Sequence, residues 1–547
     1  MHRPRTRRER ELREAAKAHV GPFGFGGANR DVGVAKGAAE SAPATADKPG
    51  TGAHSATNNQ AEGVGEPDVV QTDGRRVVTV ADGGLRVADV ATRQVTSTLD
   101  IPGGATELLL HGDRALVFGP PARVTLVDLA GPARILGTLD VTGSHVDARA
   151  VGGTVRVVVS SAPRLPFVQP DAGLSAAAAE RGNHAVLERA TVDDWLPCYT
   201  LTTPDGGTTS GRLVECSRIS HPRNYRAASL LTVLTFDLAG ELGTGDPVAV
   251  VADGQTVYGT ASALYVAHQR WQAGSGAART ELYQFDLDTG GPPEHVASGA
   301  VEGALLNQYA LSEHDGHLRV ATTTGSGTPD GPGGSESRVT VLERRGSRLA
   351  ETGLLTGLGP GERIYAVRFA GPVGYVVTFR QTDPLYTLDL SDPARPRAVG
   401  ELKITGYSAY LHPVGQGRLI GVGQEADRRG VVQGLQVSLF DVTDPAAPRR
   451  VTQYRLDGGW AQVEADPRAF LYWEPSGLLV LPTHAEALVL RVAGDRITEL
   501  GRSAHPTRAQ PVRRAVVLGA ELWTVSGAGI LVHDATTMTP RQWLPFR

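Results

Sequence analysis

Acidic residues recur at the ends of short apolar runs in this chain, and their spacing is the strongest constraint on its fold. Seven such runs end in aspartate: Asp89, Asp128, Asp237, Asp286, Asp389, Asp441 and Asp534. Glu343 and Arg491 occupy the equivalent position in two further runs. The successive spacings are 39, 109, 49, 57, 46, 52, 50 and 43 residues. Most of them lie near the length of one propeller blade, which is about 40–50 residues.

The best-formed unit lies between Gly361 and Gly406. Gly, Pro and Asp separate four runs that are rich in β-branched and aromatic residues. The pattern predicts strands over 363–370, 374–380, 385–390 and 397–404. A unit of this kind cannot bury both of its faces alone, so it needs neighbours of its own kind.

The same register divides most of the chain into nine four-strand units. They begin near residues 68, 104, 145, 253, 302, 361, 407, 460 and 510. The long interval after Asp128 must contain an insertion, and residues 165–228 supply it, in the third unit. The predicted fold is therefore all-β: a β-propeller of eight or nine four-stranded blades over residues 67–547. Closed propellers typically have 4–8 blades, so the sequence leaves eight and nine open.

The recurring aspartates are expected to be architectural. A carboxylate at the end of a strand can accept backbone N–H groups of the turn that follows. Because these carboxylates occur once per unit, we assign them to turns and not to catalysis or metal binding.

Composition excludes several classes of function. The formal net charge of the 547 residues is −4, so no basic surface is available for nucleic acid. No run of 18 apolar residues occurs, which predicts no transmembrane segment. HExxH, GxSxG, Walker A and CxxC motifs are absent from the sequence. We therefore expect no cofactor and no metal site, and we expect a monomer.

Residues 1–66 do not have the pattern of a packed domain. Residues 7–20 can form a short helix, and residues 33–66 are rich in Ala, Gly, Thr and Pro. The segment is predicted to be a short helix followed by a flexible, mostly unstructured linker. A basic start is followed by polar residues where the apolar core of a signal peptide would be, so no signal peptide is visible.

Four stretches resemble one known family, the secreted proteins with a C-terminal β-propeller domain distantly related to WD40 repeats. The stretches are 62–90, 361–406, 407–425 and 434–450, and the resemblance extends from about residue 60 to the end. It implies a propeller fold, an extracellular or cell-envelope location, and a cap or side arm formed by the insertion. It implies no particular reaction.

The insertion contains both cysteines of the chain, Cys198 and Cys216, 18 positions apart. In an oxidising compartment we expect a disulfide between them, which would add roughly 3 kcal/mol of stability. Residues 174–190 have helical composition, interrupted at Gly182.

Propellers bind ligands with the connections between strands two and three and between strand four and the next blade. In this chain those connections, with the strand residues beside them, contain aromatic and charged side chains that suit recognition of a peptide or glycan. The candidate binding residues are Trp271, Arg380, Gln381, Asp383, Tyr407, Tyr410, His412, Trp460 and Glu464.

Three hypotheses follow for function. The first is a non-enzymatic extracellular or cell-envelope propeller that binds a protein or polysaccharide through its loop-rich face and the insertion. The second is a hydrolase or lyase that uses His412 with Asp383 or Glu464 as acid and base, which requires these groups to meet around a pocket. The third is a purely structural scaffold.

Overall fold

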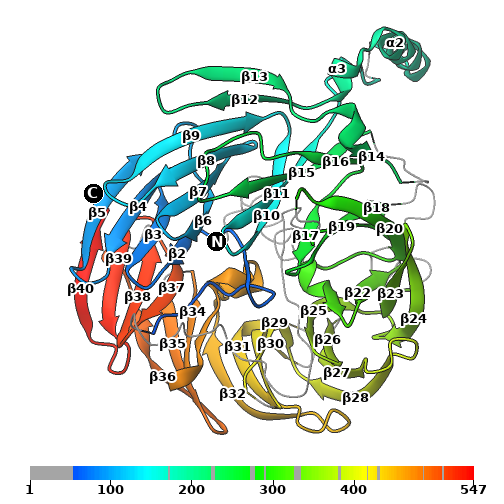
Figure 1. The fold of residues 1–547 in the computed structure, drawn as a ribbon. Helices are drawn as coiled ribbons and strands as arrows, with labels where there is room; N and C mark the ends of the chain where they lie inside the picture. Colours follow the sequence, from blue (N-terminus) through cyan, green and yellow to red (C-terminus); the bar gives the residue numbers. More distant parts are fainter. Residues whose placement is uncertain are drawn as a thin grey trace, which may run out of the picture.

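The computed structural model is a closed ring of four-stranded antiparallel blades (Figure 1). It describes residues 53–170, 173–222, 228–271, 277–288, 291–325, 334–379, 383–415, 417–427, 431–484, 486–507 and 510–546. The predicted helix over 7–20 lies outside these ranges. Within them the ring has nine blades, which resolves the choice between eight and nine.

In each blade the first strand lies toward the ring centre and the fourth lies at the circumference (Figure 1). Blade 1 comprises β2 (Val70–Thr72), β3 (Arg76–Ala81), β4 (Gly84–Asp89) and β5 (Gln94–Asp100). Blade 2 comprises β6 (Glu107–His111), β7 (Arg114–Gly119), β8 (Arg123–Asp128) and β9 (Arg134–Val141). Blade 3 comprises β10 (Ser144–Val151), β11 (Thr154–Ser161), β15 (Leu230–Asp237) and β16 (Val248–Val251). Blade 4 comprises β17 (Thr256–Gly259), β18 (Ala263–Trp271), β19 (Ala278–Asp286) and β20 (Glu294–Glu302). Blade 5 comprises β21 (Leu311–His314), β22 (His317–Thr324), β23 (Glu336–Arg345) and β24 (Arg348–Leu358). Blade 6 comprises β25 (Arg363–Ala370), β26 (Val373–Phe379), β27 (Asp383–Asp389) and β28 (Arg397–Ile404). Blade 7 comprises β29 (Tyr407–Pro413), β30 (Arg418–Ala426), β31 (Val432–Asp441) and β32 (Arg449–Asp457). Blade 8 comprises β33 (Leu471–Trp473), β34 (Leu478–Pro482), β35 (Ala487–Ala493) and β36 (Arg496–Ser503). Blade 9 comprises β37 (Val512–Leu518), β38 (Glu521–Ser526), β39 (Gly529–Asp534) and β40 (Pro540–Pro545).

The recurring aspartates form turns, as predicted from the sequence. Each accepts a backbone N–H of the turn after the third strand, at 2.8–3.2 Å: from Thr92 to Asp89, Ala130 to Asp128, Ala239 to Asp237, Asp288 to Asp286, Ser391 to Asp389, Thr443 to Asp441 and Thr536 to Asp534. In four blades an arginine at the start of the fourth strand also pairs with the carboxylate: Arg134, Arg397, Arg449 and Arg541.

These contacts favour the ionised carboxylate, as the Asp389 turn illustrates. The Ser391 hydroxyl and backbone N–H, together with Arg397, lower the pKa of Asp389 to about 2. The role of the carboxylate is therefore structural, and it is repeated from blade to blade.

Apolar side chains fill every junction between adjacent blades in the described ring. Nine clusters of buried residues each join two neighbouring blades, from blades 1 and 2 around to blades 9 and 1. The closing cluster brings Val77 and Ala88 of blade 1 against Trp523 and Val525 of blade 9. Each blade therefore buries both faces against its neighbours, which explains why the repeat closes on itself.

The stretch that precedes blade 1 lies inside the ring, where Figure 1 shows it in blue. It enters beside blade 9, where His54 bridges Leu518, and β1 (Val64–Gly65) pairs with the inner strand of blade 3. Asp68 then bridges Leu108 of blade 2 before β2 begins. We call residues 54–69 the central segment.

The packed part of the chain therefore begins before residue 66, where the sequence analysis placed the boundary. Residues 54–66 were predicted to belong to a flexible linker, because residues 33–66 are rich in Ala, Gly, Thr and Pro. In the structure Ser55, Gln60 and Glu66 are each at most 5% exposed. Their polar side chains find partners on blades that are far away in the sequence.

Buried ion pairs connect the central segment to the ring. The guanidinium of Arg514 on β37 donates to both carboxylate oxygens of Asp68 at 2.9 and 3.0 Å and also pairs with Asp466. Arg468 pairs with Glu107 at 2.8 Å and donates to the Pro67 carbonyl. Burial alone would raise the pKa of Asp466, but the charges of Arg514 and Arg468 hold that pKa well below its usual range.

The insertion leaves blade 3 between β11 and β15 and lies along the circumference (Figure 1). Its hairpin, β12 (Cys198–Thr202) and β13 (Thr208–Arg212), extends blade 2 beyond β9, and β14 (Ile219–Ser220) pairs with the outer strand β16 of blade 3. Helices α2 (Ala176–Arg189) and α3 (Val192–Trp195) project beyond the ring. α2 runs through Gly182 without the break that the sequence suggested.

Short 3-10 turns complete the described elements. They are η1 (Cys216–Arg218), η2 (Gln308–Ala310), η3 (Gln462–Glu464), η4 (Pro467–Ala469) and η5 (Glu474–Ser476). η2, η3 and η4 lie in connections between blades, where they contact the central segment or the inner strands.

Substituting Arg514 with leucine is predicted to destabilise the fold strongly. The change leaves Asp68 and Asp466 buried without their shared cation, and loss of one partner of a buried pair costs about 3–5 kcal/mol. The free energy of unfolding, measured by denaturant titration of the full chain, checks this value. Arg541→Leu is the matched control, because it removes an exposed guanidinium that bridges Glu521 and Asp534 within the same blade. Equal losses in the two variants would contradict the role given to the central ion pairs.

Candidate binding surface on the loop face

The two faces of the ring differ in their connections. One face, the turn face, has the turns between strands one and two and between strands three and four, including the aspartate turns. The other, the loop face, has the connections between strands two and three and from strand four to the next blade. Trp271, Tyr407, Trp460 and Glu464 all lie at loop-face connections.

Trp460 is presented to solvent by a specific backbone arrangement. Gly458 and Gly459, directly before it, have φ of 71° and 75°, which side chains other than glycine disfavour. The Gly458 N–H donates to the Gln433 carbonyl at 3.0 Å, which ties this turn to blade 7. The indole that follows is 42% exposed. Trp460 is therefore an exposed aromatic residue on a tethered turn.

Glu464 anchors the other end of the same turn. Its Oε1 accepts the Ala461 N–H at 2.9 Å and the Gln424 side-chain N–H at 2.6 Å. Burial raises the pKa of Glu464 to about 7. Trp460 therefore lies between a glycine pair and a buried carboxyl group, so its position is defined on both sides.

A polar hollow of about 320 Å³ lies at the loop-face end of blade 7. It is lined by Glu425, Ala426, Asp427, Gln433, Gly434, Leu435, Arg455, Leu456 and Asp457. Glu425 accepts from Thr405 and Gln453 and pairs with Arg455 at 2.7 Å. Asp457 is exposed and directly precedes the glycine pair that presents Trp460. We call the hollow together with Trp460 the blade 7 rim.

Trp271 provides a second exposed aromatic residue on the loop face. It ends β18 in blade 4 and is 52% exposed. Arg270 beside it pairs with Glu281 of the adjacent strand at 3.5 Å. The two exposed indoles therefore lie on the same face but on different blades.

Three predicted site residues are placed toward the interior. Tyr410 is 3% exposed, and its hydroxyl accepts a hydrogen bond from Asn58 of the central segment at 2.7 Å. The His412 ring packs against Phe470 of blade 8, with centroids 4.6 Å apart. Tyr407 is half-buried and packs against aromatic rings of blade 6.

Three predicted site residues remain, at the connection between β26 and β27. Arg380 and Gln381 lie outside the described residues. The Asp383 backbone pairs with Ile404 at the start of β27, and its side chain lies outside the described part.

The acid/base pair that the hydrolase or lyase hypothesis requires is not formed by His412 and Glu464. His412 hydrogen-bonds to Tyr410 at 3.2 Å, and Glu464 binds Gln424 and the Ala461 backbone. Burial, helped by the charge of Arg368, lowers the pKa of His412 well below its usual value. Neither described hollow is lined by His412.

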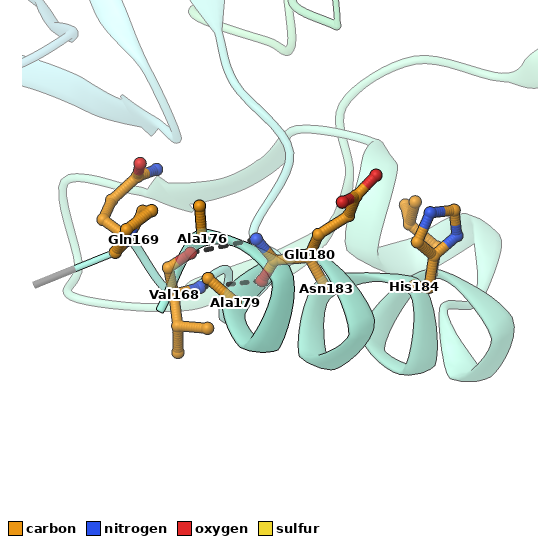
Figure 2. Close-up of a pocket in the computed structure, with 9 residues that line it drawn as sticks. Val168, Gln169, Ala176, Ala179, Glu180, Asn183 and His184 are labelled. Carbon is orange, nitrogen blue, oxygen red and sulfur yellow. Dashed lines mark hydrogen bonds between the residues drawn. The ribbon is translucent and has the colours of Figure 1, made fainter. Parts of the chain in front are cut away.

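A second hollow, of about 310 Å³, lies on the insertion between α2 and residues 168–170 (Figure 2). Figure 2 shows the Asn183 amide holding the backbone of Val168: the Val168 N–H donates to Asn183 Oδ1, and Asn183 Nδ2 donates to the Val168 carbonyl, both at 2.9 Å. The insertion also exposes several large apolar side chains, namely Phe167, Val168, Leu187, Val192 and Trp195.

The two cysteines do not form the expected disulfide; both thiols are free. Cys198 lies in β12, where its backbone pairs with Arg212. The chain then buries Leu213 and Val214 against the ring and reaches Cys216 at the exposed start of η1. The packing of these two apolar residues separates the paths of the thiols.

Among the described residues, no group of three or more His, Cys, Asp or Glu side chains is arranged to hold a metal ion. Of the helices in the same ranges, none is long and apolar enough to cross a membrane.

Replacing Glu464 with glutamine is predicted to change the pH dependence of stability. The usual pKa of 4.5 applies to the unfolded chain, and burial raises the folded-state pKa to about 7. Between these values only the unfolded chain is ionised, so the wild type loses stability as pH rises, by about 3 kcal/mol in total. Glutamine removes this loss, so the stability of the variant relative to wild type should rise from pH 4.5 to 7 and then level off.

Denaturant titrations across that pH range measure the difference. Glu351→Gln, which changes an exposed carboxyl on β24, provides the control and should show no such trend. A difference for Glu464→Gln that is constant with pH would contradict the raised pKa.

Two curated archaeal proteins are similar to part of this chain. "Uncharacterized protein MJ1554" of Methanocaldococcus jannaschii is 38% identical over 260 residues, which is 48% of this chain and 38% of that protein. An "Uncharacterized protein" of Archaeoglobus fulgidus is 40% identical over 204 residues, or 37% of this chain and 30% of that one. The chain thus aligns with less than half the length of either of these curated relatives.

Solved structures give a weaker likeness. AztD of Citrobacter koseri has a TM-score of 0.37 at 12% identity, with 88% of this chain and 94% of that chain covered. The computationally designed Ika8 protein has a TM-score of 0.38 at 9% identity, with 88% and 96% covered. Scores of this size carry no argument about function.

The sequence pattern of the beta propeller domain family, by contrast, matches residues 54–538. That span covers nearly all of the described ring and begins with the central segment. The chain belongs to the beta propeller domain family.

Proposed function

We propose that the protein is a non-enzymatic binding scaffold of the extracellular space or cell envelope that holds a polysaccharide on its loop face. The observation that carries this proposal is Trp460, an exposed indole fixed between a glycine pair and the buried Glu464, next to a polar hollow. A flat aromatic ring can cover the apolar C–H face of a sugar, while nearby carboxylates and amides accept and donate hydrogen bonds to its hydroxyl groups.

The distribution of the exposed aromatic residues favours a polymer. Trp271 and Trp460 lie on the same face but on blades 4 and 7–8. A ligand that extends over several blades can contact both, and its two contacts reinforce each other. The ring centre is already filled by the central segment, which favours binding across the loop face over binding within the channel.

The path of the chain supports display of this face. Ala53 accepts a hydrogen bond from the Gly519 N–H at 2.8 Å, at the turn between the first two strands of blade 9. Ala53, the first described residue, therefore lies on the turn face. Attachment to the envelope on the turn face would present the loop face outward, in keeping with the location that the family resemblance implies.

Substitution of Trp460 or Trp271 by alanine is predicted to weaken polysaccharide binding about tenfold each, equivalent to about 1.4 kcal/mol. The double variant should bind weakest, because it loses both aromatic contacts. Affinity electrophoresis in gels that contain soluble neutral or acidic polysaccharides measures the effect.

Leu354→Ala is the matched control, since this exposed apolar residue lies on the outer strand β24 and not on the loop face. Unchanged binding in the double variant would overturn the assignment of the site. If none of the polysaccharides retards the wild type while immobilised peptides do, the ligand is a protein and the polysaccharide proposal fails. No binding of either kind would favour a purely structural scaffold.

A further inference from the structure

The first half of the central segment adds nothing to the apolar junctions that close the ring. Residues 54–62 contribute no side chain to any of the nine clusters between blades, including the one that joins blades 9 and 1. The second half differs, because Val69 belongs to the closing cluster and β1 pairs with blade 3. The ring is therefore complete without residues 54–62.

Residues 54–62 are held instead by hydrogen bonds of the kind that bind peptides. The Ser55 N–H donates to the Val517 carbonyl at 2.9 Å, and the Val517 N–H donates to the Ser55 hydroxyl oxygen at 2.8 Å. Ser55 thus satisfies both backbone groups of one inner-strand residue, as an added strand would.

Two side-chain amides continue this pattern on other blades. Asn58 Nδ2 donates to the Tyr410 hydroxyl at 2.7 Å and to the Pro467 carbonyl at 2.8 Å. Gln60 Nε2 donates to the carbonyls of Gln308 and Leu311, at 3.4 and 3.3 Å. The hydroxyl group of Ser55 therefore contacts blade 9, the amide of Asn58 contacts blades 7 and 8, and the amide of Gln60 contacts blade 5.

The buried arginines at the ring centre, Arg149 and Arg514, do not need residues 54–62 to balance their charge. The buried arginines at the centre retain carboxylates of the ring itself: Asp147 for Arg149 and Asp466 for Arg514. Departure of the stretch would uncover backbone carbonyls, the Val517 N–H and the Tyr410 hydroxyl, groups that water can satisfy. It would also remove the hydrogen bonds that the Gln60 N–H and Asn59 Oδ1 make with Glu66. Glu66 would keep Gln308 Nε2 at 3.4 Å and Arg149 at 3.9 Å, so this buried carboxylate would not be left unpaired.

The two halves of the central segment meet at an exposed turn. Glu62 and Gly63 are exposed, Gly63 has φ of 73°, and a Cβ at Gly63 would meet no neighbouring atom within 4 Å. Val64, the next residue, is 2% exposed. A break at this turn would separate the hydrogen-bonded stretch from the part that belongs to the ring.

We propose that the ring centre is a peptide-binding site, occupied in cis by residues 54–62. Its ligands are extended peptides that carry a hydroxyl followed by two side-chain amides, with the spacing of Ser55, Asn58 and Gln60. The tethered stretch blocks this site in the intact chain, so a peptide supplied by another molecule binds only when residues 54–62 leave. This site is separate from the blade 7 rim and does not rest on polysaccharide binding.

The test uses the full chain with a protease recognition sequence inserted between Glu62 and Gly63. After cleavage, a fluorescent synthetic peptide of residues 53–62 is added in excess, and its fluorescence anisotropy is followed at several temperatures up to 37 °C. The cleaved ring should stay folded by circular dichroism and take up the peptide as the original fragment leaves. The uncleaved protein should take up none.

The specificity control is the same peptide with Asn58→Ala and Gln60→Ala, which removes the hydrogen bonds of both amides. It should bind at least about tenfold more weakly, as expected for loss of several modest hydrogen bonds. Three results would overturn the proposal: unfolding of the ring on cleavage, which would make the stretch part of the architecture; a folded ring that takes up no peptide; or equal binding of both peptides.

Discussion

The structure depends on the burial of apolar surface between adjacent blades. A single four-stranded sheet of this composition has two apolar faces and can cover neither alone, so each blade requires a neighbour on both sides. Nine clusters satisfy this requirement around the described ring, and the last one, which contains Trp523, joins blade 9 to blade 1. Nine blades leave a centre wide enough to admit a stretch of polypeptide, and the chain fills it with residues 54–69.

Filling the centre has consequences for where ligands can bind. Buried ion pairs at Arg514 and Arg468 fix the later part of the central segment, while hydrogen bonds from Asn58 and Gln60 hold the earlier part. The loop face is then the open surface on which aromatic residues are exposed. Trp460 is exposed because two glycines and Glu464 define its turn, so that its side chain cannot pack back into the junction between blades 7 and 8.

The sequence predicted the features that are local and repeated. Seven aspartate turns, with Glu343 and Arg491 at the equivalent positions, marked nine candidate units, and the four strands predicted between 361 and 406 agree with β25 to β28 within two residues at each end. These predictions succeed because turn chemistry and strand alternation involve neighbouring residues. The Gly458–Gly459 pair before Trp460 was a local signal of the same kind, although the sequence alone did not show that the indole would be exposed.

The features that the sequence did not predict depend on contacts between distant segments. Residues 54–66 have the composition of a linker, and nothing local indicates that Asn58 will meet Tyr410 or that Glu66 will be buried near Arg149. His412 was predicted at the surface, but Phe470 from the next blade covers it. Cys198 and Cys216 were expected to pair, and burial of the intervening Leu213 and Val214 directs the chain elsewhere.

Residues 54–69 are packed inside a closed nine-bladed ring. Hydrogen–deuterium exchange of the full chain tests this packing directly, because backbone amides are protected only when they are hydrogen-bonded and shielded from water. The Ser55, Val64 and Asp68 amides donate to the carbonyls of Val517, Ala61 and Leu108. We expect these amides to exchange slowly, at rates comparable to those of the inner strands β29 and β37. Exchange over 54–69 as fast as in exposed turns would contradict this packing.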